Sequence, residues 1–354
     1  MITTPDDSQL DELCEQLSAL GHTLEDGSWP RRQMELCGEY GVFEWFIPCE
    51  WGGQDWNESE IVRGYLKLSA ACLNTTFIIT QRTGACRRIA VSENDSLKQR
   101  WLQKLTTNEV FSTVGVSHLT TSRRHLAKPV LCAEETSAGF RLDGFSPWVT
   151  GSPQADMVVT GATMADGRQI LVALPTDLKG VSTPPTPKLV GLSSSQTGQF
   201  VCDRVEMPSE LLLAGPIENV MQSGSGAGTG GLQTSTLAVG LAGAAVDLIE
   251  KEAGKRPELD SPAAALRAEW QTLCGDLLST ADGQPVCSNE ELRTRANSHV
   301  LRASQAALSA AKGTGYVEGH PAGRWCREAL FFLVWSCPQS VVAANLCELA
   351  GIEG

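Results

Sequence analysis

The sequence is short of basic residues, histidine and long apolar runs. Lys and Arg number 28 against 41 Asp and Glu, so the net charge is -13, and only five His occur in 354 residues. This charge opposes attraction to nucleic acid or anionic lipid. No apolar run approaches the roughly 18 residues of a membrane span, and residues 1–17 lack the features of a secretory signal. We therefore expect a cytoplasmic protein with no nucleic-acid partner and no membrane span.

Cysteine is present, but not in the patterns that bind metal or form a disulfide framework. The twelve Cys lie singly and far apart, and no C-x-x-C pair occurs. The spacing of a structural zinc site is therefore absent. We expect reduced, buried thiols and no metal.

Three regions follow one another along the chain, predicted at residues 1–108, 109–215 and 216–354. The first is helical: apolar positions recur every three or four residues in DSQLDELCEQLSAL and SEIVRGYLKLSAACL, and SENDSLKQRWLQKL opens on Ser and Asn, which are helix-capping residues. The second contains short β-rich runs. Within it, Asp143-Gly144 and Asp166-Gly167 separate alternating apolar runs, which predicts two hairpin turns.

The third region has long helical periodicity, which continues through WCREALFFLVWS at residues 325–336. Small residues at helical spacing (Ala238, Gly240, Ala242, Ala245) predict close helix packing. The segment from Gly226 to Gly231 satisfies G-x-G-x-x-G, but no buried strand leads into it. A Rossmann dinucleotide site is therefore disfavoured, and we interpret the segment as a flexible entry to the helices.

Four segments, in order, resemble the acyl-CoA dehydrogenase family: FEWFIPCEWGG, DGFSPWVTGSPQADMVVTGA, KLVGLSSSQTGQFVCDRVEMP and GTGYVEGHPAGRWCREA. They span nearly the whole chain. The resemblance implies an α+β fold with an N-terminal helical domain, a middle β-barrel domain and a C-terminal four-helix bundle. It also implies FAD between the last two domains, an acyl-CoA or other acyl thioester substrate, and a homodimer or homotetramer.

The resemblance gives several residues an expected role in binding FAD. Trp148 and Thr150 fall where the family contacts the flavin ring, and Ser117 falls at a flavin-contacting hydroxyl position. His118 replaces the usual acidic neighbour. Taken alone, Trp148 is more typical of a core aromatic, and Ser117 and His118 of polar residues that satisfy loop amides.

Two further residues match the part of the family that binds the pyrophosphate and adenine of FAD. Arg256 matches an arginine that would pair with the pyrophosphate of a neighbouring subunit's FAD, and Gly313 keeps a glycine on the adenine side. The chain departs from the pattern at Leu259, Asp260 and Lys312, which replace Phe, Gly and Gly.

The catalytic base of the family has no counterpart in this sequence. Dehydrogenation of an acyl thioester needs a carboxylate to remove the Cα proton. The family's Glu position falls on Ser336, which is too weakly basic, and the alternative base and substrate-arginine positions fall on Gly230 and Gly231. The neighbouring Cys337 is a weak candidate for a nucleophile, since no His partner is identifiable.

Three explanations remain open. Glu318, Glu328 or His118 could supply the base if the last segment is displaced. The chemistry could have changed to one that needs no Cα base, such as oxygen activation at reduced flavin. The fold could also persist in a non-catalytic protein that binds a ligand or partner.

Overall fold

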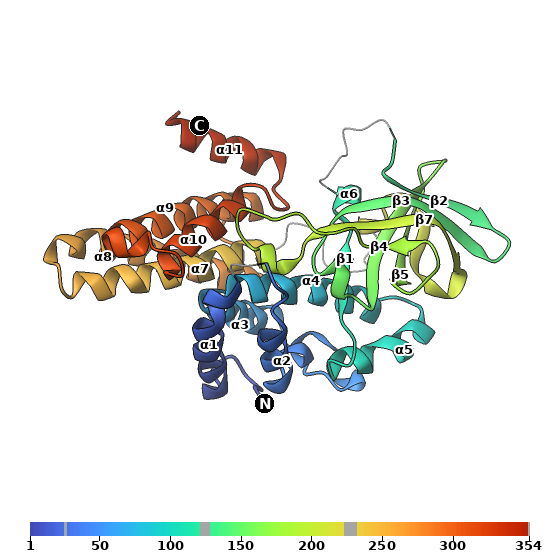
Figure 1. The fold of residues 1–354 in the computed structure, drawn as a ribbon, viewed down its shortest axis with the longest axis horizontal. Helices are drawn as coiled ribbons and strands as arrows, with labels where there is room; N and C mark the ends of the chain where they lie inside the picture. Colours follow the sequence, from blue (N-terminus) through green and yellow to red (C-terminus); the bar gives the residue numbers. More distant parts are fainter. Residues whose placement is uncertain (25–26, 121–127, 223–231, 353–354) are drawn as a thin grey trace.

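The fold consists of N-terminal helices, a middle sheet and a C-terminal helical bundle, as Figure 1 shows. It was obtained as a computed structural model that describes residues 1–24, 27–120, 128–222 and 232–352. The G-x-G-x-x-G segment, with Gly230 and Gly231, lies outside these residues. The order of helices, strands and helices agrees with the predicted fold class.

The N-terminal helices begin where the sequence supplies capping side chains. Asp7 accepts a hydrogen bond from the Gln9 N–H, and Asn94 accepts one from the Leu97 N–H at 3.1 Å, which confirms the predicted Asn cap. Asn57 forms a reciprocal capping box with Glu60. These helices are α1 (Ser8–Leu20), α2 (Arg31–Glu39), α3 (Glu58–Ala71), α4 (Leu73–Ala90) and α5 (Asp95–Thr106).

The middle region is one eight-stranded sheet with the order β6-β7-β3-β2-β4-β5-β8, and β1 pairs in parallel with β4. Its strands are β1 (Ser112–Gly115), β2 (Leu131–Thr136), β3 (Gly139–Val149), β4 (Met157–Met164), β5 (Gln169–Pro175), β6 (Val181–Ser182), β7 (Gly198–Pro208) and β8 (Leu212–Ile217). The short helix α6 (Ser117–Thr120) follows β1.

Of the two predicted hairpin turns, one is confirmed and one is wrong. Asp166-Gly167 lies in the turn between the antiparallel strands β4 and β5. Asp143-Gly144 instead lies inside β3, where the pairing with β7 shifts register. Gly144 has a φ of 124° and lies so close to the Val130 carbonyl that a Cβ would clash with it. The pair therefore forms a β-bulge, which, like a hairpin turn, needs a glycine with positive φ.

The C-terminal bundle consists of α7 (Leu232–Ala253), α8 (Asp260–Ala281), α9 (Asn289–Gly315), α10 (Pro321–Ala329) and the peripheral α11 (Gln339–Ala350). The predicted helix through residue 336 is wrong, because α10 ends at Ala329 and a 3-10 turn (Leu330–Leu333) follows. Asn297 of α9 donates to the carbonyl of Phe332, so that carbonyl bonds across the bundle. The chain then turns at Ser336, which has a φ of 43°.

Helix α7 packs tightly into the molecule, as its small residues predicted. A Cβ on Gly240 would lie 2.7 Å from the Leu66 carbonyl oxygen, and Ser69 of α3 donates a hydrogen bond to the Leu237 carbonyl. By length and composition α7 could also span a membrane, which the sequence analysis did not anticipate. Since 67% of its apolar window is buried inside the protein, we interpret α7 as a core helix.

Helix α4 joins the two hydrophobic cores. Its Phe77 and Ile78 belong to the core of the helical regions, whereas Ala85 and Ile89 belong to the core of the sheet. Figure 1 shows α4 between the bundle and the sheet. One continuous helix therefore contributes side chains to both cores.

The prediction that the cysteines are buried is only partly correct. All twelve thiols are free. Four of them are buried, whereas Cys49 and Cys132 are exposed and the others are half-buried.

The contact between α3 and α7 can be tested with a single methyl group. Gly240→Ala should lower the free energy of unfolding by about 1–3 kcal/mol, because the new Cβ overlaps α3. Gly275→Ala in α8 is the matched control. It has no atom within 4 Å of the new Cβ, so it should raise stability by up to ~1 kcal/mol. Urea denaturation of both variants measures the difference, and equal effects would contradict the close packing.

Candidate functional site

A cavity of about 540 Å³ lies between the sheet and the bundle, and we call it the first cavity. Its volume is within the usual range for small-molecule sites. Five separate segments line it: Phe77 of α4, Ser117, Trp148, the loop before β7 (Leu189–Leu192, Ser195, Thr197), and the end of α10 with the following turn (Arg327, Leu330, Phe331 and Val334–Cys337). It thus brings together Ser117 and Trp148, which were expected to contact flavin, with Ser336 and Cys337.

Trp148 is held at the mouth of this cavity by the end of β3. Strand alternation places Val149 fully in the core and leaves Trp148 42% exposed. Thr150 is fully buried, and it does not itself line the cavity. Its hydroxyl lies 3.0 Å from that of Thr197, which lies 2.8 Å from that of Ser195. Thr150 is therefore linked to the cavity through the hydroxyl groups of Thr197 and Ser195, which do line it.

Ser117 opens α6 and faces the cavity with a buried hydroxyl. Its Oγ has no hydrogen-bond partner among the described residues. A buried hydroxyl without a partner costs about 1–3 kcal/mol, so a ligand atom that bonds to it would recover this free energy. The site thus has unfulfilled hydrogen-bonding capacity beside the exposed indole.

His118 is turned away from the first cavity. Its Nε2–H donates to the Gly161 carbonyl at 2.7 Å, and burial lowers the pKa of the ring. The neutral imidazole thus links α6 to β4 by this hydrogen bond. It does not line the first cavity, so it is poorly placed as a base there.

Among the described lining residues of the first cavity, the ionisable side chains are those of Arg327 and Cys337. Burial raises the pKa of Cys337, with Arg293 acting in the opposite direction, so we expect a neutral thiol at pH 7. Glu318 and Glu328 line a neighbouring cavity instead. Glu328 is buried there, 3.7 Å from the Arg324 guanidinium.

Aromatic side chains build the wall around Ser336. Trp335 stacks on Phe331 with ring centroids 5.3 Å apart, and it forms a T-shaped pair with Phe77 of α4, with centroids 4.8 Å apart. Asn297 and Arg293 of α9 donate to the carbonyls of Phe332 and Trp335 and so fix the turn. Aromatic rings and two hydrogen bonds from α9 therefore hold the turn that contains Ser336.

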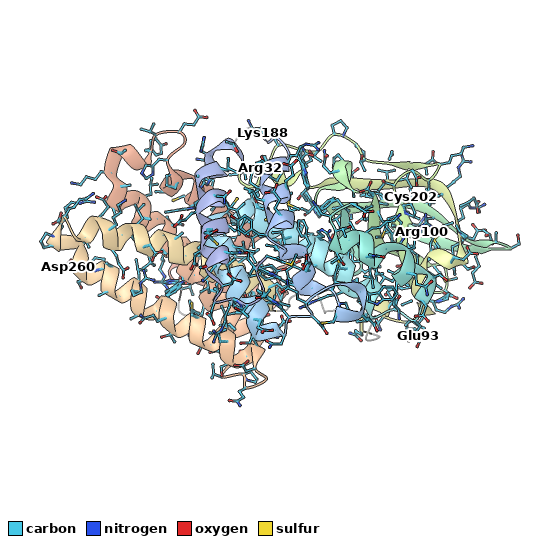
Figure 2. All side chains as sticks on the ribbon, turned by 90° about the horizontal axis from the view of Figure 1, so that it is seen from below. Arg32, Glu93, Arg100, Lys188, Cys202 and Asp260 are labelled. Carbon is cyan, nitrogen blue, oxygen red and sulfur yellow. The ribbon has the colours of Figure 1, made fainter. Side chains whose placement is uncertain are left out.

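Arg256 and Gly313 lie outside the first cavity. The Arg256 guanidinium pairs with Glu252 at 2.9 Å and donates to the Ala310 carbonyl near the end of α9. Close by, Lys312 leaves the helical conformation, and a Cβ on Gly313 would meet no atom within 4 Å. Asp260, four residues after Arg256, lies at one tip of the molecule in Figure 2. Cys202 of the sheet lies toward the other end, so this tip is the end of the bundle far from the sheet.

Several lining residues were missed by the sequence analysis. Phe77, Arg327 and the segment Leu189–Leu192 reach the cavity only through the packing of α4, α10 and the sheet. The hydroxyls of Ser195 and Thr197 carried a weak signal, because they fall within the segment KLVGLSSSQTGQFVCDRVEMP that resembles the family.

Comparison with known proteins identifies the relatives of this chain. Residues 12–109 match the family model described as "Acyl-CoA dehydrogenase, N-terminal domain". A probable acyl-CoA dehydrogenase, YngJ, from Bacillus subtilis (strain 168) is 24% identical over 255 residues, which are 70% of this chain and 66% of that protein. The chain therefore aligns with slightly less than two thirds of that relative's length.

Two solved structures share the fold. A glutaryl-coenzyme A dehydrogenase glutaryl-CoA complex superimposes with a TM-score of 0.82 at 18% identity, over 98% of this chain and 96% of the other. A glutaryl-CoA dehydrogenase from Mycobacterium smegmatis in complex with FADH2 gives a TM-score of 0.79 at 15% identity, over 99% and 96%. Together they show that this chain has the acyl-CoA dehydrogenase fold, and its residues 12–109 are similar to the N-terminal domain of that family.

Proposed function

We propose that this protein is an FAD-dependent oxidoreductase that acts on an acyl thioester, such as an acyl-CoA, or a related acyl compound, with an atypical active site. The observation that carries this proposal is the first cavity, which combines the exposed Trp148, the unpartnered hydroxyl of Ser117 and the turn at Ser336. The proposal places the protein in the cytoplasm as a homodimer or homotetramer. FAD would supply the acceptor for a hydride from the substrate.

The residues of the first cavity fit a flavin ring. The indole of Trp148 offers a planar face for stacking, and Ser117 offers a hydroxyl to a ring heteroatom. Thr197, whose hydroxyl contacts that of Thr150, adds a second hydroxyl to the cavity lining. A relative of the same fold has been solved in complex with FADH2, which supports the assignment.

The rest of the FAD would meet a second subunit. Arg256 and Gly313 do not line the first cavity of their own chain, so in our proposal they reach the pyrophosphate and adenine of a partner's FAD. Arg256 is already oriented by Glu252 and the end of α9. Its guanidinium would thus need little reorganisation to bind a diphosphate.

A second candidate chemistry is favoured by the lining of the same cavity. Because its described ionisable side chains are one Arg and one Cys, removal of a thioester Cα proton has no evident acceptor there. A reaction at reduced flavin that needs no Cα base, such as oxygen activation, therefore fits this lining better than removal of a Cα proton does. A protein that binds its ligand without turnover is the third candidate.

Flavin binding can be tested with variants of Trp148 and Ser117. After reconstitution with FAD, wild-type protein should show the visible absorption of bound flavin. Trp148→Ala should weaken binding about tenfold or more through lost stacking, and Ser117→Ala by up to about tenfold. Val91→Ala, at an exposed site outside the cavity, is the control and should bind normally. A colourless wild-type protein that cannot be reconstituted would refute the oxidoreductase proposal.

The absence of a base can be tested by installing one. In anaerobic mixing with butyryl-CoA, Ser336→Glu should bleach bound flavin about 100-fold faster or more than wild type, because a carboxylate then lies in the cavity. Ser336→Gln is the matched control, with similar size but no basicity, and should not accelerate bleaching. Fast bleaching by wild-type protein would instead show that another residue removes the proton.

Sharing of each FAD site between subunits can be tested by mixing two defective chains. Trp148→Ala and Arg256→Gln should each lose most FAD binding alone. A co-expressed heterodimer contains one site with both defects and one with none, so it should bind about one FAD per two chains. Absorbance of the purified heterodimer, isolated with two different tags, gives this ratio. If the heterodimer binds no more FAD than either parent, Arg256 does not act across the interface.

A further inference from the structure

A second cavity, of about 730 Å³, lies beside the first. The two share one wall, formed by Leu189–Leu192 and Arg327. The wall is tightly packed, since a Cβ on Gly191 would lie 2.8 Å from the Arg327 carbonyl oxygen. The remaining sides are Leu24, Asn74, Lys188 and Ser193, the end of α9 with the following turn (Leu308, Gly315–Glu318), and α10 (Gly323, Arg324, Cys326, Glu328). Ser117, Trp148 and Ser336 do not contribute to it.

Asn74, in the first turn of α4, faces the second cavity. The residue is only 2% exposed, and neither its Nδ2 nor its Oδ1 has a hydrogen-bond partner among the described residues. A buried polar atom without a partner costs about 1–3 kcal/mol, and Asn74 has two. A buried amide whose N–H and carbonyl both lack partners indicates a ligand that accepts one hydrogen bond and donates another.

The charges around the second cavity select the kind of ligand. Lys188, Arg324 and Arg327 line it together with the carboxylates of Glu318 and Glu328, which leaves an excess of one positive charge in a protein of net charge -13. Asn74 also belongs to the positive end of an 18-residue helix whose N-cap, Cys72, makes no side-chain capping bond. One negative charge, as on a carboxylate, balances this excess better than the two of a phosphate monoester.

The cavity also offers apolar surface. Leu24, Leu192 and Leu308 line it, and Val190, Tyr316 and Val317 at its edge are unusually exposed, at 72%, 87% and 62%. Apolar groups of this size are normally covered unless they meet a ligand or partner. A short alkyl group on the ligand would contact these side chains.

We propose that the second cavity binds a small monocarboxylate that carries a neighbouring hydroxyl group and a short alkyl chain. The carboxylate accepts from the Asn74 Nδ2–H with the cationic side chains nearby, and the hydroxyl donates to the Asn74 Oδ1. This site is separate from the proposed flavin site, and the inference does not depend on FAD binding.

The test is isothermal titration of the full chain with 2-hydroxybutyrate, in a buffer free of carboxylates and phosphate. Wild-type protein should give saturable binding at ~10 mM or below. Butyrate, which lacks the hydroxyl, 1,2-butanediol, which lacks the charge, and inorganic phosphate should each bind at least about tenfold more weakly. Absence of saturable binding to wild-type protein, or equal binding of phosphate or the diol, would overturn the proposal.

Variants separate a binding role of Asn74 from a structural one. Asn74→Leu has nearly the same shape, so it should weaken 2-hydroxybutyrate binding about tenfold or more while the thermal midpoint without ligand stays constant or rises. Lys188→Gln, at an exposed position, should weaken binding about twofold to fivefold and provides a test even if the first variant does not fold. Trp148→Ala, in the other cavity, should bind the acid normally. Unchanged binding in both the Asn74 and Lys188 variants would refute the assignment.

Discussion

Two buried side chains of α9 hold the turn on which the first cavity depends. Asn297 donates to the Phe332 carbonyl at 3.0 Å, and Arg293 donates to the Trp335 carbonyl at 3.1 Å. Burial lowers the pKa of Arg293 to about 10, so the guanidinium remains charged at neutral pH even though it is only 5% exposed. Hydrogen bonds offset part of the cost of a buried charge, and here Nη2 donates to the carbonyls of Phe332 and Trp335, while Nε has no partner among the described residues. The charge and the turn therefore stabilise each other, and together they fix Trp335, Ser336 and Cys337 against α4.

Much of the fold could be predicted from the sequence because its signals are local. Helix periodicity, the Asn cap at Asn94 and the small residues of α7 each act within a few residues or on one helix face. The errors arose where a distant contact decides the conformation. Asp143-Gly144 has turn chemistry, but its pairing with β7 makes it a bulge, and α10 ends early because α9 binds the carbonyls that a longer helix would use internally.

The candidate site was less predictable, because five segments far apart in sequence converge on it. Ser117 and Trp148 were identified only through the resemblance, since an isolated Trp is more typical of a core residue. Arg327, Phe77 and the segment Leu189–Leu192 had no such signal. Asn74 could not have been singled out at all. A buried amide becomes informative only when its missing partners are known, and these depend on the whole packing around α4.

The atypical chemistry follows from how α10 presents its last residues. Arg327 lines both cavities, whereas Glu328, the next residue, lines only the second. Successive residues of a helix point about 100° apart, so Glu328 could enter the first cavity only if α10 rotated by roughly this angle. Such a rotation would carry Arg324, on the same helix and 3.7 Å from Glu328, along with it, and would disturb the close approach of Gly191 to the Arg327 carbonyl. The packing that keeps the two cavities apart is therefore also what keeps this buried carboxylate away from the proposed flavin.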